Sequence, residues 1–240
     1  MKKILICSPT YNESDNIKIL CKKIFKINNN FHLLIIDDNS PDGTYKIVEK
    51  LKFKYKNLRL LKRTKKLGLG SAIREGMGYA LKNNYYALIT LDADLSHNPK
   101  EIPLLISKSK SNDFVIGSRY VKDGSSDYVG YRNMISRLAN KLCRSLLNIP
   151  FDEFTTNFRL YNYKCLKVLN ESSLKSDNYS SQIEFLFYIY KAGLKCIEVP
   201  ISFKDRYKGN SKIPKLQILY SGLKLIELFI KNIIIPKKKL

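Results

Sequence analysis

The chain has 240 residues, of which 44% are hydrophobic and 27% charged, which fits one globular domain of moderate size or one domain with an appendage. The 43 Lys and Arg residues outnumber the 21 Asp and Glu residues. The resulting net charge of +22 indicates an anionic partner (nucleic acid, an anionic membrane surface or a phosphorylated substrate), unless it reflects compositional drift toward Lys. The five scattered cysteines form no C-x-x-C pair, which argues against a disulfide framework or a zinc site and indicates a reducing compartment. With two histidines and no Gly-x-Ser-x-Gly motif, the chain offers little from which to build a hydrolase triad.

Strand patterns alternate with helix patterns along the first half of the chain, which predicts an α/β fold with a mostly parallel central sheet flanked by helices. Strands are expected at residues 3–8, 32–37, 58–62, 86–91 and 113–118. Helices are expected between them, near residues 15–25, 44–51, 71–82 and 99–107. In the less regular second half, helices are expected at residues 131–147 and 181–192, and strands at 158–163 and 195–203.

The tail at residues 213–235 has apolar residues at helical spacing, followed by a proline and three lysines. Lys224, Glu227 and Lys231 interrupt the apolar pattern, so the tail falls short of the roughly 20 apolar residues that a membrane-spanning helix needs. The pattern predicts an amphipathic helix on a membrane surface, held by the basic cluster. The chain is thus divided into a domain at residues 1–212 and a tail at 213–240. The alternative is a helix packed on its own domain.

The most informative motif is Asp92-Ala93-Asp94, which follows the apolar run at residues 86–91. A strand of this composition is expected to be buried on both faces of a parallel sheet, and its carboxyl end is where open α/β sheets bind ligands. A hard divalent cation such as Mg²⁺ or Mn²⁺, bridged to a substrate phosphate, would stabilise two carboxylates in that crevice. The ordinary alternative is that Asp94 caps the following turn.

Polar motifs follow each of the first four predicted strands. They are PTYNE at residues 9–13, DDNSPDG at 37–43, KKLGLGS at 65–71 and DAD at 92–94. Each can be explained singly as a turn or a helix start. Because the carboxyl ends of parallel strands meet at one edge of a sheet, the four together predict one continuous crevice.

Further motifs extend the pattern along the chain. They are GLGSA at residues 68–72, DADLSHNP at 92–99, GSRY at 117–120, RNMISRLAN at 132–140, FRLY at 158–161, SSQIE at 180–184 and VPISFKDRYKGNSK at 199–212. From about residue 3 to residue 212 the sequence resembles glycosyltransferase family 2, with its nucleotide-sugar-binding GT-A fold, and within it the dolichyl-phosphate or polyprenol-phosphate mannosyltransferases. The N-terminal motifs are common to many members and imply the fold. The motif at 199–212 is more specific and implies a polyprenyl-phosphate acceptor.

The resemblance also implies roles for individual residues. The nucleotide's base and ribose would be held by Pro9, Tyr11, Glu13 and Asp38. Asp92 and Asp94 would bind the metal and, through it, the donor diphosphate. The donor and acceptor phosphates would be surrounded by Arg119, Arg132, Ser136, Arg206 and Lys212, although each cation could instead be a solvated surface residue. The residues predicted to be catalytic are Asp94, Arg119 and Arg206. Gln182 and Glu184 also match the family, in a helix facing the active site, and Glu184 is assigned no role as a base.

The metal site departs from the family at one position. Many relatives have Gln two residues after the second Asp, where this chain has Ser96, a weaker ligand, so the resemblance does not fix metal affinity or identity. His97 could approach the same cation, although a loop imidazole is more often uninvolved. No general base is required, because a phosphate monoester acceptor is already anionic at neutral pH. The remaining tasks are to align two anions and to stabilise the departing nucleotide diphosphate, which a metal and cationic side chains can do.

The resemblance implies an inverting, metal-dependent enzyme that moves mannose from GDP-mannose to a polyprenyl (dolichyl-type) phosphate and gives a β-linked lipid-phosphate mannose. One alternative changes the donor to UDP-glucose or another nucleotide sugar, because Tyr11, Glu13 and Asp38 do not distinguish guanine from uracil. A remote alternative is a non-enzymatic nucleotide- or nucleic-acid-binding module, which the net charge would permit. The acidic pair would repel a polyanion and no RNA-stacking signature occurs, so nucleic acid is not expected as a partner.

The two ends of the chain bear on its location. The N-terminal apolar run spans only residues 4–8, too short for the core of a signal peptide. Together with the amphipathic tail, this predicts a cytoplasmic protein that is peripheral on the cytosolic face of a membrane. The expected partners are a nucleotide sugar, a polyprenyl-phosphate lipid and the anionic membrane surface, with room for a small membrane-protein partner.

Overall fold

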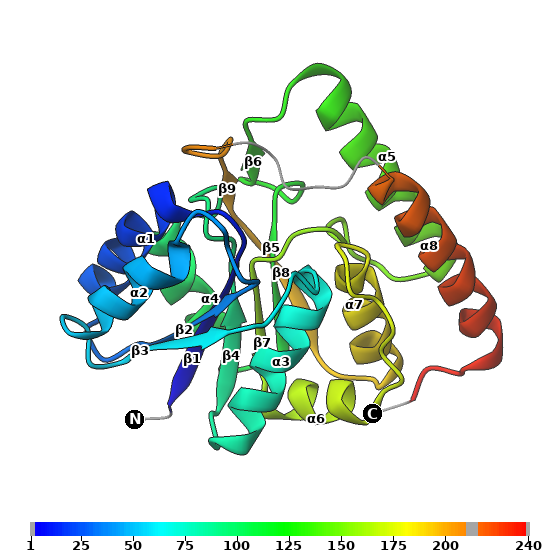
Figure 1. Ribbon diagram of the computed structural model, residues 1–240. Coiled ribbons are helices and arrows are strands. Elements are labelled where there is room, and N and C mark those ends of the chain that lie inside the picture. Colours follow the sequence, from blue (N-terminus) through cyan, green and yellow to red (C-terminus); the bar gives the residue numbers. More distant parts are fainter. Residues whose placement is uncertain (1–2, 210–215, 239–240) are drawn as a thin grey trace.

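A computed structural model of the protein describes residues 3–209 and 216–238. Within these residues, the centre is a seven-stranded sheet in the order β3-β2-β1-β4-β7-β5-β8 (Figure 1). Its strands are β1 (Ile4–Thr10), β2 (His32–Asp37), β3 (Leu58–Lys62), β4 (Ala87–Thr90), β5 (Phe114–Ser118), β7 (Arg159–Asn162) and β8 (Cys196–Pro200). β7 runs antiparallel to β4 and β5, and the other neighbouring pairs are parallel. The predicted α/β fold with a mostly parallel sheet is confirmed.

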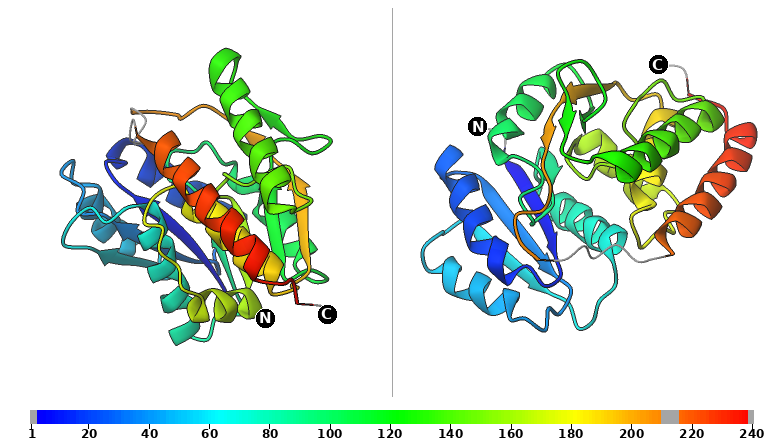
Figure 2. Two further views of the ribbon diagram at one scale, coloured as in Figure 1. Left: turned by 90° about the vertical axis from the view of Figure 1, so that its right-hand side faces the viewer. Right: turned by 90° about the horizontal axis from the view of Figure 1, so that it is seen from above.

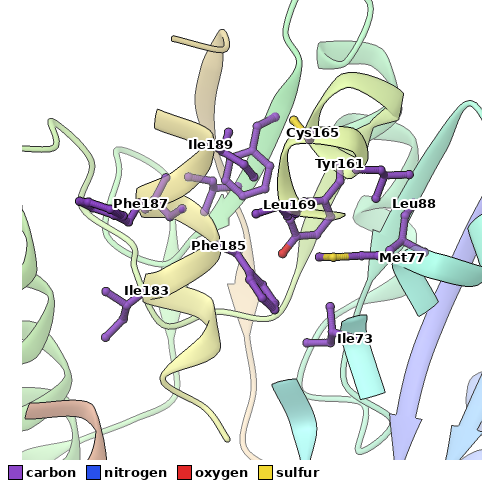
Figure 3. Packing of buried hydrophobic residues seen from close by; sticks show 14 of the residues in the cluster. Ile73, Met77, Leu88, Tyr161, Cys165, Leu169, Ile183, Phe185, Phe187 and Ile189 are labelled. Carbon is purple, nitrogen blue, oxygen red and sulfur yellow. The ribbon is translucent and has the colours of Figure 1, made fainter. Parts of the chain in front are cut away.

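Helices cover both faces of the sheet. One face carries α1 (Ser14–Ile27), α2 (Thr44–Lys52), the 3₁₀ turn η1 (Pro99–Glu101) and α4 (Ile102–Lys108), and the other carries α3 (Leu69–Lys82), α6 (Tyr163–Glu171) and α7 (Ser181–Lys191). Side chains alternate across each strand, so Ile6 of β1 joins the first core while Leu5 and Cys7 join the second. Figure 3 shows the second core, where Phe185 and Ile189 of α7 pack with Tyr161 and Met77.

The remaining elements lie at one flank of the sheet. They are β6 (Ser125–Ser126), α5 (Gly130–Leu147), β9 (Ser202–Phe203) and α8 (Gln217–Ile234). β6 and β9 form a small parallel sheet. α5 and α8 lie side by side in both views of Figure 2. In the described part of the chain, no helix is both long and apolar enough to cross a membrane.

Two predicted elements of the second half are wrong in detail. The single strand expected at residues 195–203 is two strands, β8 in the large sheet and β9 in the small one, separated at Ile201. The strand expected at 158–163 ends at Asn162, where α6 begins, a helix that the sequence pattern did not predict. The Asn162 side chain accepts a hydrogen bond from the Cys165 backbone N–H and so caps this helix.

The strand order reverses beside β1. β2 and β3 lie on one side of β1, whereas β4 lies on the other. Along the chain β1 is followed by β2 on one side of the sheet, and β4 by β5 on the other, so the connections that leave these two strands diverge and open a crevice at their carboxyl ends. Residues 9–13, at the end of β1 and just after it, and residues 92–94, after β4, lie at this crevice.

Candidate active site

A cavity of about 880 Å³ lies at this crevice. All the predicted site residues that the structure describes line it, namely Pro9, Tyr11, Glu13, Asp38, Asp92, Asp94, Ser96, Arg119, Arg132, Ser136 and Arg206. Lys212 lies outside the described residues. Side chains separated by almost 200 positions in the sequence therefore meet in one place.

The carboxylates of Asp92 and Asp94 are oriented by neighbouring groups. The Asn157 amide donates to Asp92 Oδ1 at 2.9 Å, and the Ser96 backbone N–H donates to Asp94 Oδ1 at 3.0 Å. Desolvation raises the pKa of Asp92, and the negative charge of Asp94 adds to this effect, while the hydrogen bond from Asn157 and the charge of Arg206 oppose it. The Asp92 carboxylate is therefore costly to keep ionised without a cation nearby.

Arg206 supplies a cation in the free protein. Its Nη2 lies 3.1 Å from Asp94 Oδ2, and its Nη1 donates to Glu13 Oε1 at 2.5 Å. Glu13 also accepts a hydrogen bond of 2.7 Å from the Asn16 amide, while burial raises the pKa of its carboxyl. The guanidinium thus links the first and fourth strand ends of the sheet across the crevice.

The oxygen donors here fit a hard divalent cation. Ser96 is buried, and its Oγ has no hydrogen-bond partner among the described residues. Over that same part of the chain, no cluster of three or more His, Cys, Asp and Glu side chains could enclose a metal ion. An ion held by Asp92, Asp94 and Ser96 would take its other ligands from water and substrate phosphates, as Mg²⁺ commonly does.

His97 has both ring nitrogens engaged with the protein. Its Nδ1 accepts a hydrogen bond of 3.2 Å from the Asp92 backbone N–H, which leaves the proton on Nε2, 3.3 Å from Thr156 Oγ1. Burial lowers its pKa, because the charged ring is desolvated between Phe158 and Phe203. In this arrangement His97 supports the backbone at Asp92 as a neutral ring.

Asp38 stabilises the loop after β3. Its carboxylate pairs with buried Arg63 and accepts from the backbone N–H groups of Leu67 and Gly68 at 3.2 and 3.0 Å. Gly68 has φ of +94°, and a Cβ there would meet the Asp177 carbonyl oxygen at 2.3 Å. This glycine of the GLGSA motif therefore permits a close backbone contact, which is a structural reason for the motif besides phosphate binding.

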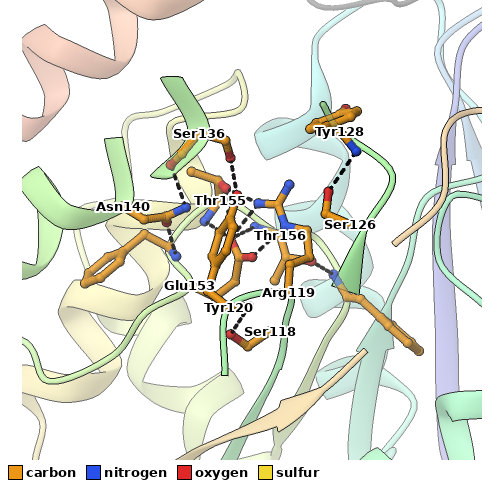
Figure 4. A network of polar contacts seen from close by, with 12 residues as sticks. Ser118, Arg119, Tyr120, Ser126, Tyr128, Ser136, Asn140, Glu153, Thr155 and Thr156 are labelled. Atoms are coloured by element: carbon orange, nitrogen blue, oxygen red, sulfur yellow. Dashed lines mark hydrogen bonds and ion pairs between the residues drawn. The ribbon is translucent and has the colours of Figure 1, made fainter. Parts of the chain in front are cut away.

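Arg119 is held by a buried acid that the sequence pattern did not reveal. Its guanidinium donates to Glu153 through Nε at 2.7 Å and Nη2 at 2.8 Å, and to Thr155 Oγ1 at 2.7 Å (Figure 4). Burial alone would raise the pKa of Glu153, but the Arg119 charge holds it below its ordinary value. Nearby, the Tyr120 hydroxyl donates to Ser136 Oγ at 2.6 Å and so ties α5 to the end of β5.

Three functional neighbours were thus missed from the sequence: Glu153, Asn157 and Tyr179. Glu153 and Asn157 orient predicted site residues, and Tyr179 lines the cavity. For Glu153 and Asn157 the available signal was that acidic and polar residues at 152–157 are interspersed with phenylalanines, because a charge in apolar surroundings requires a partner. For Tyr179 the sequence offered no such signal.

The sheet order and the cavity at its switch point define a GT-A fold. The structure resembles that of glucosyl-3-phosphoglycerate synthase from Mycobacterium tuberculosis in complex with Mn²⁺, UDP and glucosyl-3-phosphoglycerate, with a TM-score of 0.68 and 17% identity. The match covers 98% of this chain and 81% of that one. At this identity the likeness concerns the fold, and it confirms the GT-A fold expected from the sequence.

Sequence comparison gives the family. Residues 5–169 match glycosyl transferase family 2, and the chain belongs to this family. It is 32% identical over 229 residues to polyprenol monophosphomannose synthase of Mycolicibacterium smegmatis, covering 94% of this chain and 86% of that protein. It is also 31% identical over 212 residues to undecaprenyl-phosphate mannosyltransferase of Micrococcus luteus, covering 88% and 87% of the two chains.

Proposed function

We propose that the protein is an inverting glycosyltransferase that moves mannose from GDP-mannose to a polyprenyl phosphate, giving a β-linked lipid-phosphate mannose. The observation that supports this best is the meeting of Asp92 and Asp94 with Arg119, Arg132 and Arg206 in one cavity. A transfer between two phosphate-bearing substrates needs both a cation site for the leaving diphosphate and fixed positive charge for the acceptor. One relative is named polyprenol monophosphomannose synthase and the other undecaprenyl-phosphate mannosyltransferase. These names support mannose as the sugar and a polyprenyl phosphate as the acceptor.

In this proposal, Asp92 and Asp94 hold Mg²⁺ or Mn²⁺, with Ser96 as an additional oxygen donor. When bound, the ion would neutralise negative charge on the leaving nucleotide diphosphate. Pro9, Tyr11, Glu13 and Asp38 are proposed to hold the nucleoside. An acceptor phosphate oxygen attacks the anomeric carbon as the bond from that carbon to the diphosphate oxygen breaks, so the configuration inverts and no proton needs to be removed.

The positive side chains have the complementary task of aligning the two anions. Arg119 is pre-oriented by Glu153, so it can bind a phosphate oxygen without first losing much side-chain freedom. Arg206 is proposed to exchange its contacts with Asp94 and Glu13 for a substrate phosphate. Arg132 and Ser136 project from α5 into the cavity, where they are proposed to contact the acceptor phosphate, with Lys212 completing the set.

The proposed acceptor is a membrane lipid, and an unusual surface supports contact with the membrane. Large apolar side chains are exposed along α5, at Tyr131, Met134, Leu138, Leu142 and Leu146, and along α8, at Ile218, Leu219, Tyr220, Leu223, Ile226, Phe229, Ile230, Ile233 and Ile234. We name these residues the two-helix apolar surface. Tyr131 and Ile135 of α5, together with Gln217 and Ser221 of α8, also line the cavity, so the cavity and this surface share both helices.

Positive charge accompanies this surface. Arg137, Lys141 and Arg144 are exposed on α5, and Lys237 and Lys238 follow α8. Apolar side chains flanked by Lys and Arg are typical of helices that lie in the interface of an anionic membrane. We propose that residues 1–212 form the catalytic domain and that the tail at 213–240 joins α5 in holding it on the cytosolic face of a membrane.

The test of the enzymatic proposal supplies labelled GDP-mannose, undecaprenyl phosphate and Mg²⁺ or Mn²⁺ to the purified protein. Lipid-linked label is expected, and Asp94→Asn should reduce the rate by about 10²–10³-fold because it removes a charged ligand of the cation. Asp15→Asn, an exposed residue in the first turn of α1, is the matched control and should keep the wild-type rate. Absence of lipid-linked label with either metal, or full activity in Asp94→Asn, would refute the proposal.

A second donor has one observation in its favour, since the structural neighbour from Mycobacterium tuberculosis was determined with UDP. Calorimetric titration of the protein with GDP and with UDP, each in the presence of Mn²⁺, distinguishes the two donors. Tighter binding of GDP is expected. Tighter binding of UDP would favour UDP-glucose as the sugar donor.

A further inference from the structure

The segment at residues 172–180, which joins α6 to α7, forms one wall of the cavity through Asn178 and Tyr179. Its backbone is held from within by Glu184, a fully buried residue in the first turn of α7. The Glu184 carboxylate accepts hydrogen bonds from the backbone N–H groups of Lys175, at 3.2 Å, and Ser176, at 3.0 Å. This carboxylate therefore sets the path of the wall just before Asn178.

The same segment is held from the other side by α3. The Gly70 backbone N–H donates to the Asp177 carbonyl at 2.9 Å, and the Arg74 guanidinium donates to the Ser176 carbonyl at 2.5 Å and pairs with the Asp177 carboxylate. A Cβ at Gly70 would lie 2.3 Å from the Ser176 carbonyl oxygen, so the two backbones are in direct contact. The segment is thus clamped between α3 and the side chain of Glu184.

Glu184 also binds the C-terminal helix. Lys224 of α8 is buried, and its ammonium lies 3.2 Å from Glu184 Oε1 and 2.6 Å from Glu227 Oε2. The buried Glu184 carboxylate therefore accepts hydrogen bonds both from the backbone of the cavity wall and from the Lys224 ammonium of α8. A buried carboxylate needs both its counter-charge and its hydrogen bonds, so the loss of one partner weakens its contacts with the others.

We propose that Glu184 is a positioning residue that makes the geometry of the cavity wall depend on the docking of α8. While Lys224 neutralises it, Glu184 holds the 172–180 segment so that Tyr179 and Asn178 face the cavity. When α8 is displaced, the carboxylate loses its counter-charge and the segment loosens. The consequence for catalysis rests on the proposed function, in which α8 lies on the membrane and the cavity receives the lipid phosphate. The link between α8 and the wall does not rest on it.

Amide hydrogen exchange tests this link without any substrate. Lys224→Met removes the counter-charge while keeping an unbranched side chain of similar length. Lys231→Met is the matched control, because Lys231 joins α8 to α7 through the Tyr188 hydroxyl at 3.0 Å and pairs with Glu227, whereas among the described residues Glu184 pairs with Lys224. The Lys175 and Ser176 amides are expected to exchange about tenfold faster in Lys224→Met, the factor that loss of one charge-assisted hydrogen bond gives. They should stay near the wild-type rate in Lys231→Met.

Exchange in β1 serves as the check that the fold is intact. Should Lys224→Met speed exchange in β1 as well, Glu184→Gln replaces it, because the amide keeps the shape of Glu184 while removing the charge that Lys224 neutralises. An unchanged rate at Lys175 and Ser176 in a folded variant, or an equal increase in Lys231→Met, would overturn the proposal.

Steady-state kinetics then separate this proposal from the proposed function. In Lys224→Met the KM for undecaprenyl phosphate should rise about tenfold, because the loosened cavity wall holds the acceptor less well, while kcat should change less. In Lys231→Met the KM should not rise in this way. A wild-type protein with no transferase activity, combined with faster exchange only in Lys224→Met, would refute the proposed function and leave the positioning role of Glu184 intact. An unchanged KM in an active enzyme would overturn its role in positioning the cavity wall for the acceptor.

Discussion

Helices α1 and α8 have the same kind of amphipathic sequence but turn their apolar sides in opposite directions. α1 buries Ile17, Leu20 and Ile24 against the sheet and exposes its lysines. α8 buries Lys224 and exposes Ile226 and Ile230, with only Leu225 and Leu228 contributing apolar contacts to the core. The periodicity of apolar residues thus predicts that a helix forms, but it does not predict which side faces the protein.

Polar contacts replace apolar packing on the inner side of α8. Besides the pair of Lys224 with Glu184, the Lys191 ammonium of α7 donates to the backbone carbonyls of Asn232 at 3.0 Å and Ile235 at 2.5 Å, near the C-terminus of α8. A cation at this end of a helix is favourable, because the last carbonyls lack partners within the helix. α8 is therefore a docked part of the protein and at the same time presents an apolar outer face. The two alternatives for the tail, membrane helix or packed helix, are compatible.

The largest expected difference between the two helices concerns stability. Leu20→Ala in α1 should lower the free energy of unfolding by about 2–5 kcal/mol, because Leu20 is fully buried and its removal leaves a cavity. Ile226→Ala in α8 should cost less than about 0.5 kcal/mol, because this side chain is 57% exposed. Urea unfolding measures both. Equal losses would show that the outer face of α8 is buried in solution, for example against a second copy of the chain.

The next largest effect is expected in membrane binding. Ile226→Ser combined with Ile230→Ser should weaken binding to vesicles containing phosphatidylserine by about a hundredfold, since burial of each isoleucine contributes roughly 1.5 kcal/mol. Phe53→Ser is the control: Phe53 is 93% exposed but lies after α2, away from the two-helix apolar surface, and its loss should leave vesicle binding unchanged. Vesicle co-sedimentation gives the comparison, and an equal loss in both variants would contradict it.

A smaller effect should follow from removing one charge on α5. Lys141→Gln should weaken binding to anionic vesicles about fivefold, because each basic residue near such a surface contributes about 1 kcal/mol. The difference should vanish on uncharged phosphatidylcholine vesicles. It should also vanish at about 1 M salt, because the Debye length is then only about 3 Å and the attraction of Lys141 to the surface is screened. Lys82→Gln, at the C-terminal end of α3, removes an exposed charge elsewhere and should have no effect. A salt-independent loss would indicate that Lys141 acts through folding.

The smallest expected effect is a pH dependence of α8 docking. Hydrogen bonds from Lys224 and Lys231 lower the pKa of Glu227 from 4.5 to about 2. A carboxyl whose pKa is lowered by folding stabilises the protein above its unfolded pKa, so this contribution is present above pH 4.5 and is lost as the pH falls toward 2. The effect should be small, because Glu227 is partly exposed to solvent. Between pH 5 and pH 3, the thermal midpoint of wild-type protein should fall slightly more than that of Glu227→Gln; parallel curves would contradict this assignment.

The first half of the fold was predictable because β1, β2, β4 and β5 are apolar runs that are almost entirely buried. The strands at residues 32–37 and 58–62 have the bounds predicted from the sequence, although the second is an edge strand in which Arg59 and Lys62 are exposed. α6 was missed because it is short and its start depends on a capping contact of Asn162. The split between β8 and β9 depends on pairing with Ser125 and Ser126 in a distant part of the chain, which periodicity does not encode.

The candidate site was predictable to a similar degree. The strand-end motifs brought Glu13, Asp38, Asp92 and Asp94 to one cavity, as expected. The contacts that orient them were not predictable, because partners such as Asn157 with Asp92 lie 65 positions apart and are chosen by tertiary packing. Residue type indicates what chemistry a side chain can perform, whereas its supporting contacts are properties of the folded chain.

The bridge that Arg206 makes between Asp94 and Glu13 has a consequence for turnover. A cation that binds Asp94 competes with a guanidinium already in place, so part of its binding energy is spent on separating an existing ion pair. In the proposed reaction, the same pair would re-form when the cation and the spent nucleotide leave, which would favour their release. A site with such an internal counter-ion binds its ligands less tightly and regenerates its resting state faster.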